Sequence, residues 1–197
     1  MDRSVHEGKE KPMTAGPRTR LIDSAIELVR EQGVPGAGLS ALLERSNASR
    51  NSLYQHFPAG KAELVAEATT VAGAHMSAVF DRVTATGTPD QWLSGLVGWW
   101  KKALRTSDFA AGCPVVSAAL AESEPRVQAA AAAVFDGWND RLTTALSGQG
   151  IPAERARALA SLVVSALEGA IVQARATKSV QALDDLQATL GPLLRAG

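Results

Sequence analysis

A run of polar side chains between Ser49 and His56 has the chemistry to recognise the edges of DNA bases. Arg50 can donate two hydrogen bonds to a guanine, and Asn51 can pair with an adenine in the same bidentate way. Hydroxyl, amide and lysine groups nearby could reach phosphates or further bases. We therefore expect a DNA-contact set that consists of Ser40, Ser49, Arg50, Asn51, Ser52, Tyr54, Gln55, His56 and Lys61.

Presenting these side chains requires two short helices joined by a tight turn. Ser40 could cap the first helix, because a serine oxygen there accepts a bond from an otherwise unpaired backbone N–H. Asn47 suits the turn, since asparagine tolerates a left-handed backbone. Ser49 would then cap the second helix, where Leu53 and Phe57 fall on one face and can anchor it to the first.

The same segment resembles the helix-turn-helix of the TetR family of transcriptional regulators. The residues that match the family pattern are Ser49, Ser52, Leu53, Tyr54, His56, Phe57 and Lys61. The longer stretch GAGLSALLERSNASRNSLYQHFPAGKAEL is similar to the LmrA/YxaF-like branch. The chain departs from the family at Asn47 and Asn51, where glycine is usual. The match at His56 implies packing or a phosphate contact.

Upstream, an apolar stripe predicts a supporting helix that begins near Thr19 and stops at Gly33. The stripe consists of Ile22, Ala25, Ile26 and Val29. Arg18 and Arg20 lie at the start of this helix. They could contact phosphates, or they could be ordinary solvated surface charges.

The remainder of the chain also has helical periodicity, and no stretch alternates apolar and polar residues over the length of a strand. We expect helices at 61–86, 113–122, 125–148 and 152–177. A further helix should begin at Pro89, with Thr88 as its cap. Ser179 should cap a last helix, which Gly191 and Pro192 would end. The segments GCPVVSAALAESEPRV and ALASLVVSALEGAIVQARA again resemble the LmrA/YxaF-like branch.

These patterns predict an all-α protein with three parts. We expect a disordered arm at 1–16, a three-helix DNA-binding domain with the helix-turn-helix at 17–62, and a larger helical regulatory and dimerisation domain at 63–197. The 197 residues, 46% of them apolar, suffice for a sizeable core.

Charge is distributed unevenly although the formal net charge is zero. Residues 1–61 carry nine Lys and Arg against seven Asp and Glu. This small excess predicts a local DNA footprint that dimerisation would double. The start of the chain lacks the apolar core of a signal peptide, and no apolar run approaches the ~20 residues that span a bilayer. We therefore expect a cytoplasmic location and no membrane partner.

Aromatic and sulfur-containing side chains recur along the expected regulatory helices. Four tryptophans in a chain that is 5% aromatic favour a pocket for a flat apolar ligand, although an ordinary core could use the same residues. The candidate ligand-binding residues are Met76, Phe80, Trp92, Trp99, Trp100, Phe109, Cys113, Phe135 and Trp138.

The helix from Pro152 and the final helix carry rows of small and aliphatic residues that would allow close helix packing. Two such helices from each subunit could form a four-helix dimer interface, which the family resemblance also implies. The expected interface residues are Ala160, Val163, Leu167, Ala170, Ile171, Leu183, Leu186 and Leu190. The alternative is that this stripe packs within its own subunit.

Other chemistry has little support in the sequence. Cys113 is the single cysteine, so an intramolecular disulfide framework is excluded. As a thiolate at a helix N-terminus it could sense oxidants or electrophiles. A lone cysteine is more commonly a small buried residue. His75 has no second ligand at helical spacing, so we expect no metal and no cofactor. Because no catalytic motif is present, we expect no enzyme activity.

The leading hypothesis is a homodimeric repressor on a palindromic DNA operator that a small apolar or aromatic effector releases. One alternative is an activator, or a regulator without an effector, that has the same fold. A more remote alternative is a helical small-molecule-binding protein that does not touch DNA.

Overall fold

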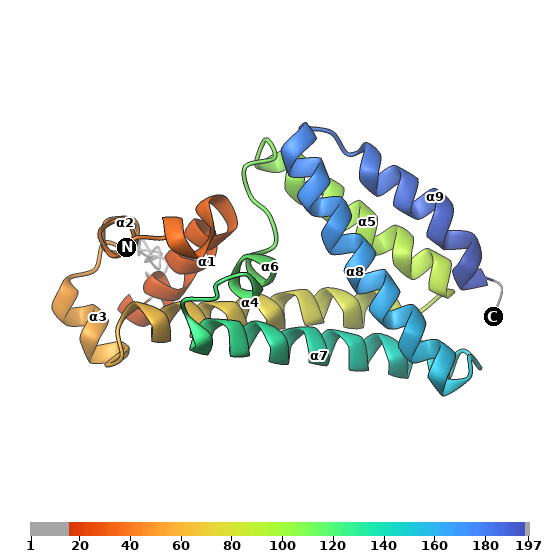
Figure 1. Ribbon diagram of the computed structural model, residues 1–197, viewed down its shortest axis with the longest axis horizontal. Coiled ribbons are helices and arrows are strands. Elements are labelled where there is room, and N and C mark those ends of the chain that lie inside the picture. The colour runs from red at the N-terminus through yellow and green to blue at the C-terminus, as the bar shows by residue number, and fades with distance from the viewer. Residues whose placement is uncertain (1–15, 196–197) are drawn as a thin grey trace, which may run out of the picture.

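The computed structural model describes residues 16–195, so most of the expected N-terminal arm lies outside the described residues. Within this range the chain forms nine α-helices and no strand, which confirms the all-α prediction. Figure 1 shows the first three helices at one end of an elongated molecule and the last two helices at the other. The helices are α1 (Pro17–Gly36), α2 (Leu39–Ser46), α3 (Arg50–His56), α4 (Lys61–Thr84), α5 (Pro89–Thr106), α6 (Pro114–Ala119), α7 (Pro125–Gly148), α8 (Ala153–Thr177) and α9 (Gln181–Arg195).

The supporting helix α1 begins at Pro17, two residues before the expected Thr19. Proline is favoured there because its missing N–H would have no helical partner at that position. Gly33 has a left-handed φ of 74° and interrupts the helix where its stop was predicted. Residues 34–36 complete the helix after this kink. The helix α1 packs against α2, α3, α4 and α6.

The long helices α4 and α7 lie side by side and connect the two ends of the molecule (Figure 1). Their close approach depends on Gly73, because a Cβ atom at this position would lie 2.5 Å from a methyl carbon of Val134. The indole Nε1 of Trp138 donates a hydrogen bond to the carbonyl oxygen of Gly73 at 3.2 Å. Phe80 and Phe135 pack against the same indole, with ring centroids at 5.7 and 5.4 Å.

The far end of the molecule consists of α5, α8 and α9. The N–H of Thr88 donates to Oε1 of Gln91 at 3.1 Å, as predicted for the start of α5. The hydroxyl of Ser179 accepts the N–H of Gln181 at the start of α9. The expected end of this last helix was wrong: Gly191 and Pro192 lie inside α9, which continues to Arg195. Burial of Leu194 explains the extension, since tertiary packing outweighs the local cost of an internal proline.

Candidate nucleic-acid interface and regulatory cavity

The turn between α2 and α3 has the geometry that the sequence predicted. Asn47 adopts a left-handed backbone with φ 48° and ψ 47°, and the Ser49 hydroxyl accepts the N–H of Ser52 at 3.0 Å. Leu53 and Phe57 are buried and fix α3 against the domain. The predicted cap at Ser40 was wrong, because α2 already begins at Leu39, leaving Ser40 exposed within its first turn.

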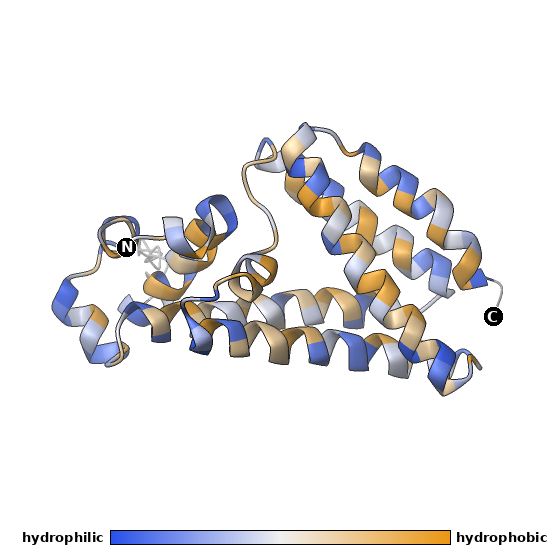
Figure 2. Ribbon diagram, viewed as in Figure 1, coloured by the Kyte–Doolittle hydropathy of each residue, from blue (hydrophilic) through white to orange (hydrophobic). Residues whose placement is uncertain are grey.

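The solvent-facing side of α3 carries the predicted contact residues. Arg50, Asn51, Gln55 and His56 are exposed, and Ser52 is half-buried. Figure 2 shows that α3 is largely hydrophilic. Among residues 16–195 no other segment covers this face, so the polar groups of α3 are available to a groove of DNA.

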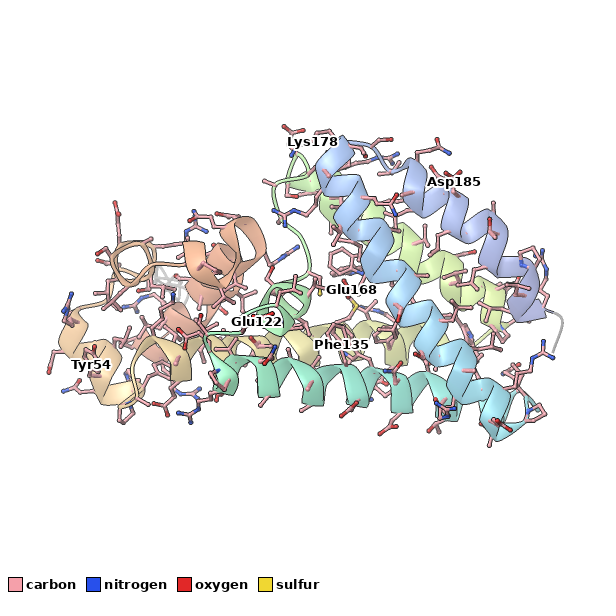
Figure 3. The ribbon with its side chains drawn as sticks, in the orientation of Figure 1. Tyr54, Glu122, Phe135, Glu168, Lys178 and Asp185 are labelled. Atoms are coloured by element: carbon pink, nitrogen blue, oxygen red, sulfur yellow. The ribbon has the colours of Figure 1, made fainter. Side chains whose placement is uncertain are left out.

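Tyr54 also projects from α3, at the outer tip of the molecule (Figure 3), and is 46% exposed. One edge of its ring packs over Gly60, where a Cβ atom would lie 3.2 Å from Cε1 of the tyrosine. Gly60 has a φ of 75°, a conformation that residues with side chains rarely adopt. The turn into α4 therefore orients the tyrosine ring.

The basic side chains beside α3 are engaged inside the domain. Lys61 is half-buried, and its Nζ donates to the carbonyl oxygen of Val34 at 3.1 Å. Arg18 pairs with Glu67 at 2.9 Å, and its guanidinium lies over the ring of Phe57. The predicted DNA contact of Lys61 therefore competes with a bond that joins α4 to the end of α1.

Arg20 has a similar structural role at the turn. Its Nε donates to the carbonyl oxygen of Ser46 at 2.9 Å, at the C-terminal end of α2. Arg45 forms a bidentate pair with Glu31, at 3.0 and 2.9 Å, and this guanidinium lowers the pKa of the Glu31 carboxyl. These pairs fix the orientation of α2 relative to α1 and thus position α3.

A cavity of about 130 Å³ lies where the first helices meet the rest of the molecule. Five of the predicted ligand-binding residues line it: Met76, Trp99, Trp100, Cys113 and Trp138. The remaining lining residues are Ile26, Arg30, Ala72, His75, Pro114 and Val115. Exposed His75 and Trp99 mark its open side, whereas Trp100, Cys113 and Trp138 are buried.

The other four predicted pocket residues do not line this cavity. Phe80 and Phe135 pack on Trp138 from outside it, and Trp92 is buried where its indole N–H donates to the carbonyl oxygen of Thr86 at 2.8 Å. Phe109 lies in the loop between α5 and α6 with a left-handed φ of 58°. For Phe80, Phe135 and Trp92 these structural roles explain the aromatic side chains.

Glu168 on α8 was missed by sequence reasoning, although it stands behind the cavity wall. Its side chain is only 9% exposed, and its Oε2 has no hydrogen-bond partner. Burial raises the pKa of Glu168 to about 7, and a hydrogen bond from the Cys113 thiol opposes this increase. The signal was present in the sequence, because Glu168 interrupts the apolar face that Val164 and Ile171 form at helical spacing.

Burial and the adjacent Glu168 together raise the pKa of the Cys113 thiol well above its usual range. The thiol is therefore protonated at neutral pH, contrary to the thiolate that a redox or electrophile sensor requires. The helix that follows, α6, is only six residues long and does not reverse this effect. In the described residues, no group of three or more His, Cys, Asp or Glu side chains could hold a metal ion.

The loop between α5 and α6 ties the cavity to α1. Gly112 donates its N–H to the carbonyl oxygen of Arg30 at 3.0 Å, and Nε of Arg30 donates back to the carbonyl oxygen of Gly112 at 3.1 Å. Arg175 of α8 donates to the carbonyl oxygens of Glu31 and Ala110, at 3.1 and 2.7 Å. These hydrogen bonds join the loop and α8 to α1, the helix that supports α2 and α3.

Comparison with known proteins agrees with this arrangement. Residues 21–68 match the model of the tetR family of bacterial regulatory proteins, and residues 89–189 match the C-terminal domain of LmrA/YxaF-like transcriptional regulators. The chain belongs to the TetR family, in its LmrA/YxaF-like branch. It is therefore a DNA-binding transcriptional regulator and not an enzyme.

The similarity to relatives spans nearly the whole chain. An uncharacterized HTH-type transcriptional regulator of Mycobacterium tuberculosis is 39% identical over 92% of this chain and 95% of its own length. The HTH-type transcriptional regulator LmrA of Bacillus subtilis is 25% identical over 90% and 96%. A TetR transcriptional regulator from Legionella pneumophila has the same fold, with a TM-score of 0.80, 16% identity, and coverage of 92% of this chain and 99% of that one.

The residues expected at a dimer interface are mostly buried within the subunit. Ala160, Val163, Leu167, Ala170, Ile171, Leu183 and Leu190 all lie in the core, and Leu186 is half-buried. Most of these residues therefore pack within their own subunit, as the alternative expected. The reason is that α8 contacts α5, α7 and α9, and α9 contacts α5 and α8. Only Ala170, Leu186 and Leu190 of the expected set border a surface groove between α8 and α9.

The outer face of α8 and α9 is nevertheless apolar. Leu162, Val172 and Leu193 are 46%, 53% and 50% exposed. By length and composition alone α8 could cross a membrane, and 39% of its most apolar 18-residue window is buried inside the protein. Figure 2 shows hydrophobic residues along much of this helix. The exposed part of the helix leaves an apolar surface that a second subunit could cover.

Proposed function

We propose that this regulator is a homodimeric repressor that binds a palindromic operator in the cytoplasm and is released by a small apolar or aromatic effector. The observation that supports this most directly is the exposed polar face of α3, with Arg50 and Asn51 on a rigidly capped helix. In this geometry the α3 of each subunit enters the major groove at one half of the operator.

Dimerisation follows from the weakness of a single reading helix. The first 61 residues carry only two more basic than acidic side chains, and several of the basic groups are paired internally. One subunit would therefore make few phosphate contacts and bind DNA weakly. The exposed apolar face of α8 and α9 supplies a surface on which two copies could associate.

The cavity provides the connection to an effector. It is bordered by Ile26 and Arg30 of α1 and by Met76 of α4, which begins directly after the turn that follows α3. A molecule that expands the cavity would displace α1 and tilt α4, and so change the spacing between the two α3 helices of the dimer. A coupling free energy of ~1–3 kcal/mol would lower operator affinity roughly 5- to 150-fold.

A regulator without an effector, or an activator, is the second candidate. The observation that favours it is the size of the cavity, since about 130 Å³ is below the roughly 300–1,000 Å³ of typical ligand pockets. A thermal-shift screen separates the two proposals. Compounds that raise the melting temperature and release the operator support the repressor, whereas a screen without any such compound favours the second candidate.

DNA recognition can be tested by selecting bound genomic fragments to obtain the operator and measuring retardation by variants. Arg50→Ala and Asn51→Ala should each reduce discrimination at particular base pairs by about 1–3 kcal/mol. Lys61→Ala should weaken binding to all sequences and decrease the salt dependence. The exposed Arg157 on α8 provides a matched control. Binding by the α3 variants that equals that of Arg157→Ala would contradict the assignment of α3 as the reading helix.

A further inference from the structure

Glu168 is a buried carboxyl that the fold does not fully satisfy. It lies on the buried side of α8, toward Cys113 at the start of α6 (Figure 3). Its Oε2 is inaccessible and has no hydrogen-bond partner in the described part of the chain. A buried acceptor without a partner destabilises a protein, so its presence requires an explanation beyond packing.

The position of this carboxyl relates it to the cavity. The Cys113 thiol hydrogen-bonds Glu168 and also lines the cavity at its buried side. Cys113 is thus the point at which the cavity and the carboxyl meet. A ligand group that displaces the small thiol would reach the unpaired Oε2.

The remaining walls favour a particular kind of ligand. Trp99, Trp100 and Trp138 provide three indole rings around the cavity, and indole faces attract cations as well as apolar groups. The basic Arg30 is committed to the carbonyl oxygen of Gly112 on the α1 side, and His75 lies at the exposed opening. The buried end of the cavity therefore combines aromatic surface with the Cys113 thiol, behind which the Glu168 carboxyl lies.

The volume limits the ligand further. A cavity of about 130 Å³ is close to the roughly 150 Å³ that accommodates one benzene molecule in an apolar protein interior. A single aromatic ring with a short substituent is thus the size that the cavity admits without large rearrangement.

From this arrangement we infer that the effector is a small aromatic amine whose protonated nitrogen pairs with the Glu168 carboxylate while its ring packs among the three tryptophans. The inference rests on the proposed effector-responsive function and specifies the chemical class of the effector. It explains why an ionisable side chain occupies the buried face of α8: the unpaired oxygen is the acceptor for the ammonium group.

The test compares phenethylamine with 2-phenylethanol, its uncharged analogue of nearly equal size. Binding to the full-length protein is measured by calorimetry and by quenching of tryptophan fluorescence. We expect phenethylamine to bind at least about 10-fold more tightly than the alcohol, since loss of one partner from a buried charge pair has an effect of this size or larger. In Glu168→Gln the preference should fall below about twofold.

Glu154→Gln is the matched control, because Glu154 is an exposed carboxyl on the same helix. This variant should retain the preference for the amine. If Glu168→Gln also retained it, or if neither compound bound the unmodified protein, the inference would be overturned. Equal affinities of the unmodified protein for the two compounds would do the same. Should Glu168→Gln fail to fold, Glu168→Met preserves the length of the side chain and must also lose the preference.

Operator retardation on the same samples separates this inference from the proposed function. If the operator is bound and another class of compound releases it, while phenethylamine does not bind, only the assignment of the amine fails. If phenethylamine binds through Glu168 and leaves operator affinity unchanged at saturation, the ligand class stands and the effector mechanism fails.

Discussion

At the scale of single residues, Glu168 determines how stability should depend on pH. Burial raises its pKa from the ordinary 4.5 to about 7, so between these values the folded state binds more protons than the unfolded state. The free energy of unfolding therefore decreases as pH rises through this window. The Cys113 thiol beside it stays protonated, because its own pKa is raised well above 9.

We expect Glu168→Gln to remove this contribution. One pKa unit corresponds to about 1.4 kcal/mol. From pH 4.5 to 7 the unmodified protein should therefore lose up to about 3 kcal/mol of unfolding free energy relative to the variant. Urea denaturation at several pH values between 5 and 8 measures most of this change. Parallel stability profiles for the two proteins would show that the carboxyl is not held in the interior.

At the scale of secondary-structure elements, the turn between α2 and α3 depends on one backbone conformation. Asn47 has a left-handed φ of 48°, which asparagine and glycine adopt more readily than other residues. Asn47→Ala should lower the unfolding free energy by about 1–2 kcal/mol, whereas Asn47→Gly should change it by less than about 1 kcal/mol. Thermal or urea unfolding of both variants tests this. Equal stability of the alanine variant and the unmodified protein would be inconsistent with strain at this turn.

Local signals explain which elements could be predicted from the sequence. The turn at Asn47, the cap at Ser49 and the interruption at Gly33 each depend on the backbone preferences of one or two residues, and all three are present. The end of the last helix was placed wrongly at Gly191, because burial of Leu194 outweighs the local breaking signal.

Other expectations that differ from the structure concern the packing of one helix on another. A stripe of small residues on α8 indicates close packing but not the identity of the neighbour. Val163 and Leu167 were expected at a dimer interface and are buried within the subunit. Likewise, tryptophan content could not distinguish Trp100, which lines the cavity, from Trp92, which packs away from it. These distinctions depend on the angles between helices, which periodicity does not specify.

At the scale of the whole molecule, the exposed face of α8 and α9 should control assembly. Replacing Leu162 and Val172 with glutamate would place charges on the apolar face. We expect the double variant to be monomeric. Its operator affinity should fall at least about 10-fold, because a monomer makes half the phosphate contacts of a dimer. Sedimentation and DNA retardation measure the two effects. Leu120→Glu, at a residue that is 76% exposed outside α8 and α9, is the control. A double variant that remains dimeric would place the interface elsewhere.

Communication between the two ends of the molecule should depend on Arg175. Its guanidinium bonds the carbonyl oxygens of Glu31 in α1 and Ala110 in the cavity loop, so it holds both against α8. We expect Arg175→Ala to lower the unfolding free energy by about 1–2 kcal/mol, since two partly exposed charge-assisted hydrogen bonds are lost. Hydrogen exchange should accelerate at the C-terminal end of α1 and at Gly112, whose N–H bonds the Arg30 carbonyl.

Lys178→Ala provides the matched comparison, because Nζ of this exposed lysine reaches the same loop through one longer bond, 3.4 Å from the carbonyl oxygen of Phe109. Its removal should change the unfolding free energy by less than about 0.5 kcal/mol and leave exchange in α1 unaltered. If the two variants accelerated exchange in α1 equally, the contact of Arg175 with Glu31 would not be what connects the cavity loop to the DNA-reading helices. Acceleration that is confined to Arg175→Ala would instead identify this side chain as the link through which a ligand-induced shift of the loop reaches α3.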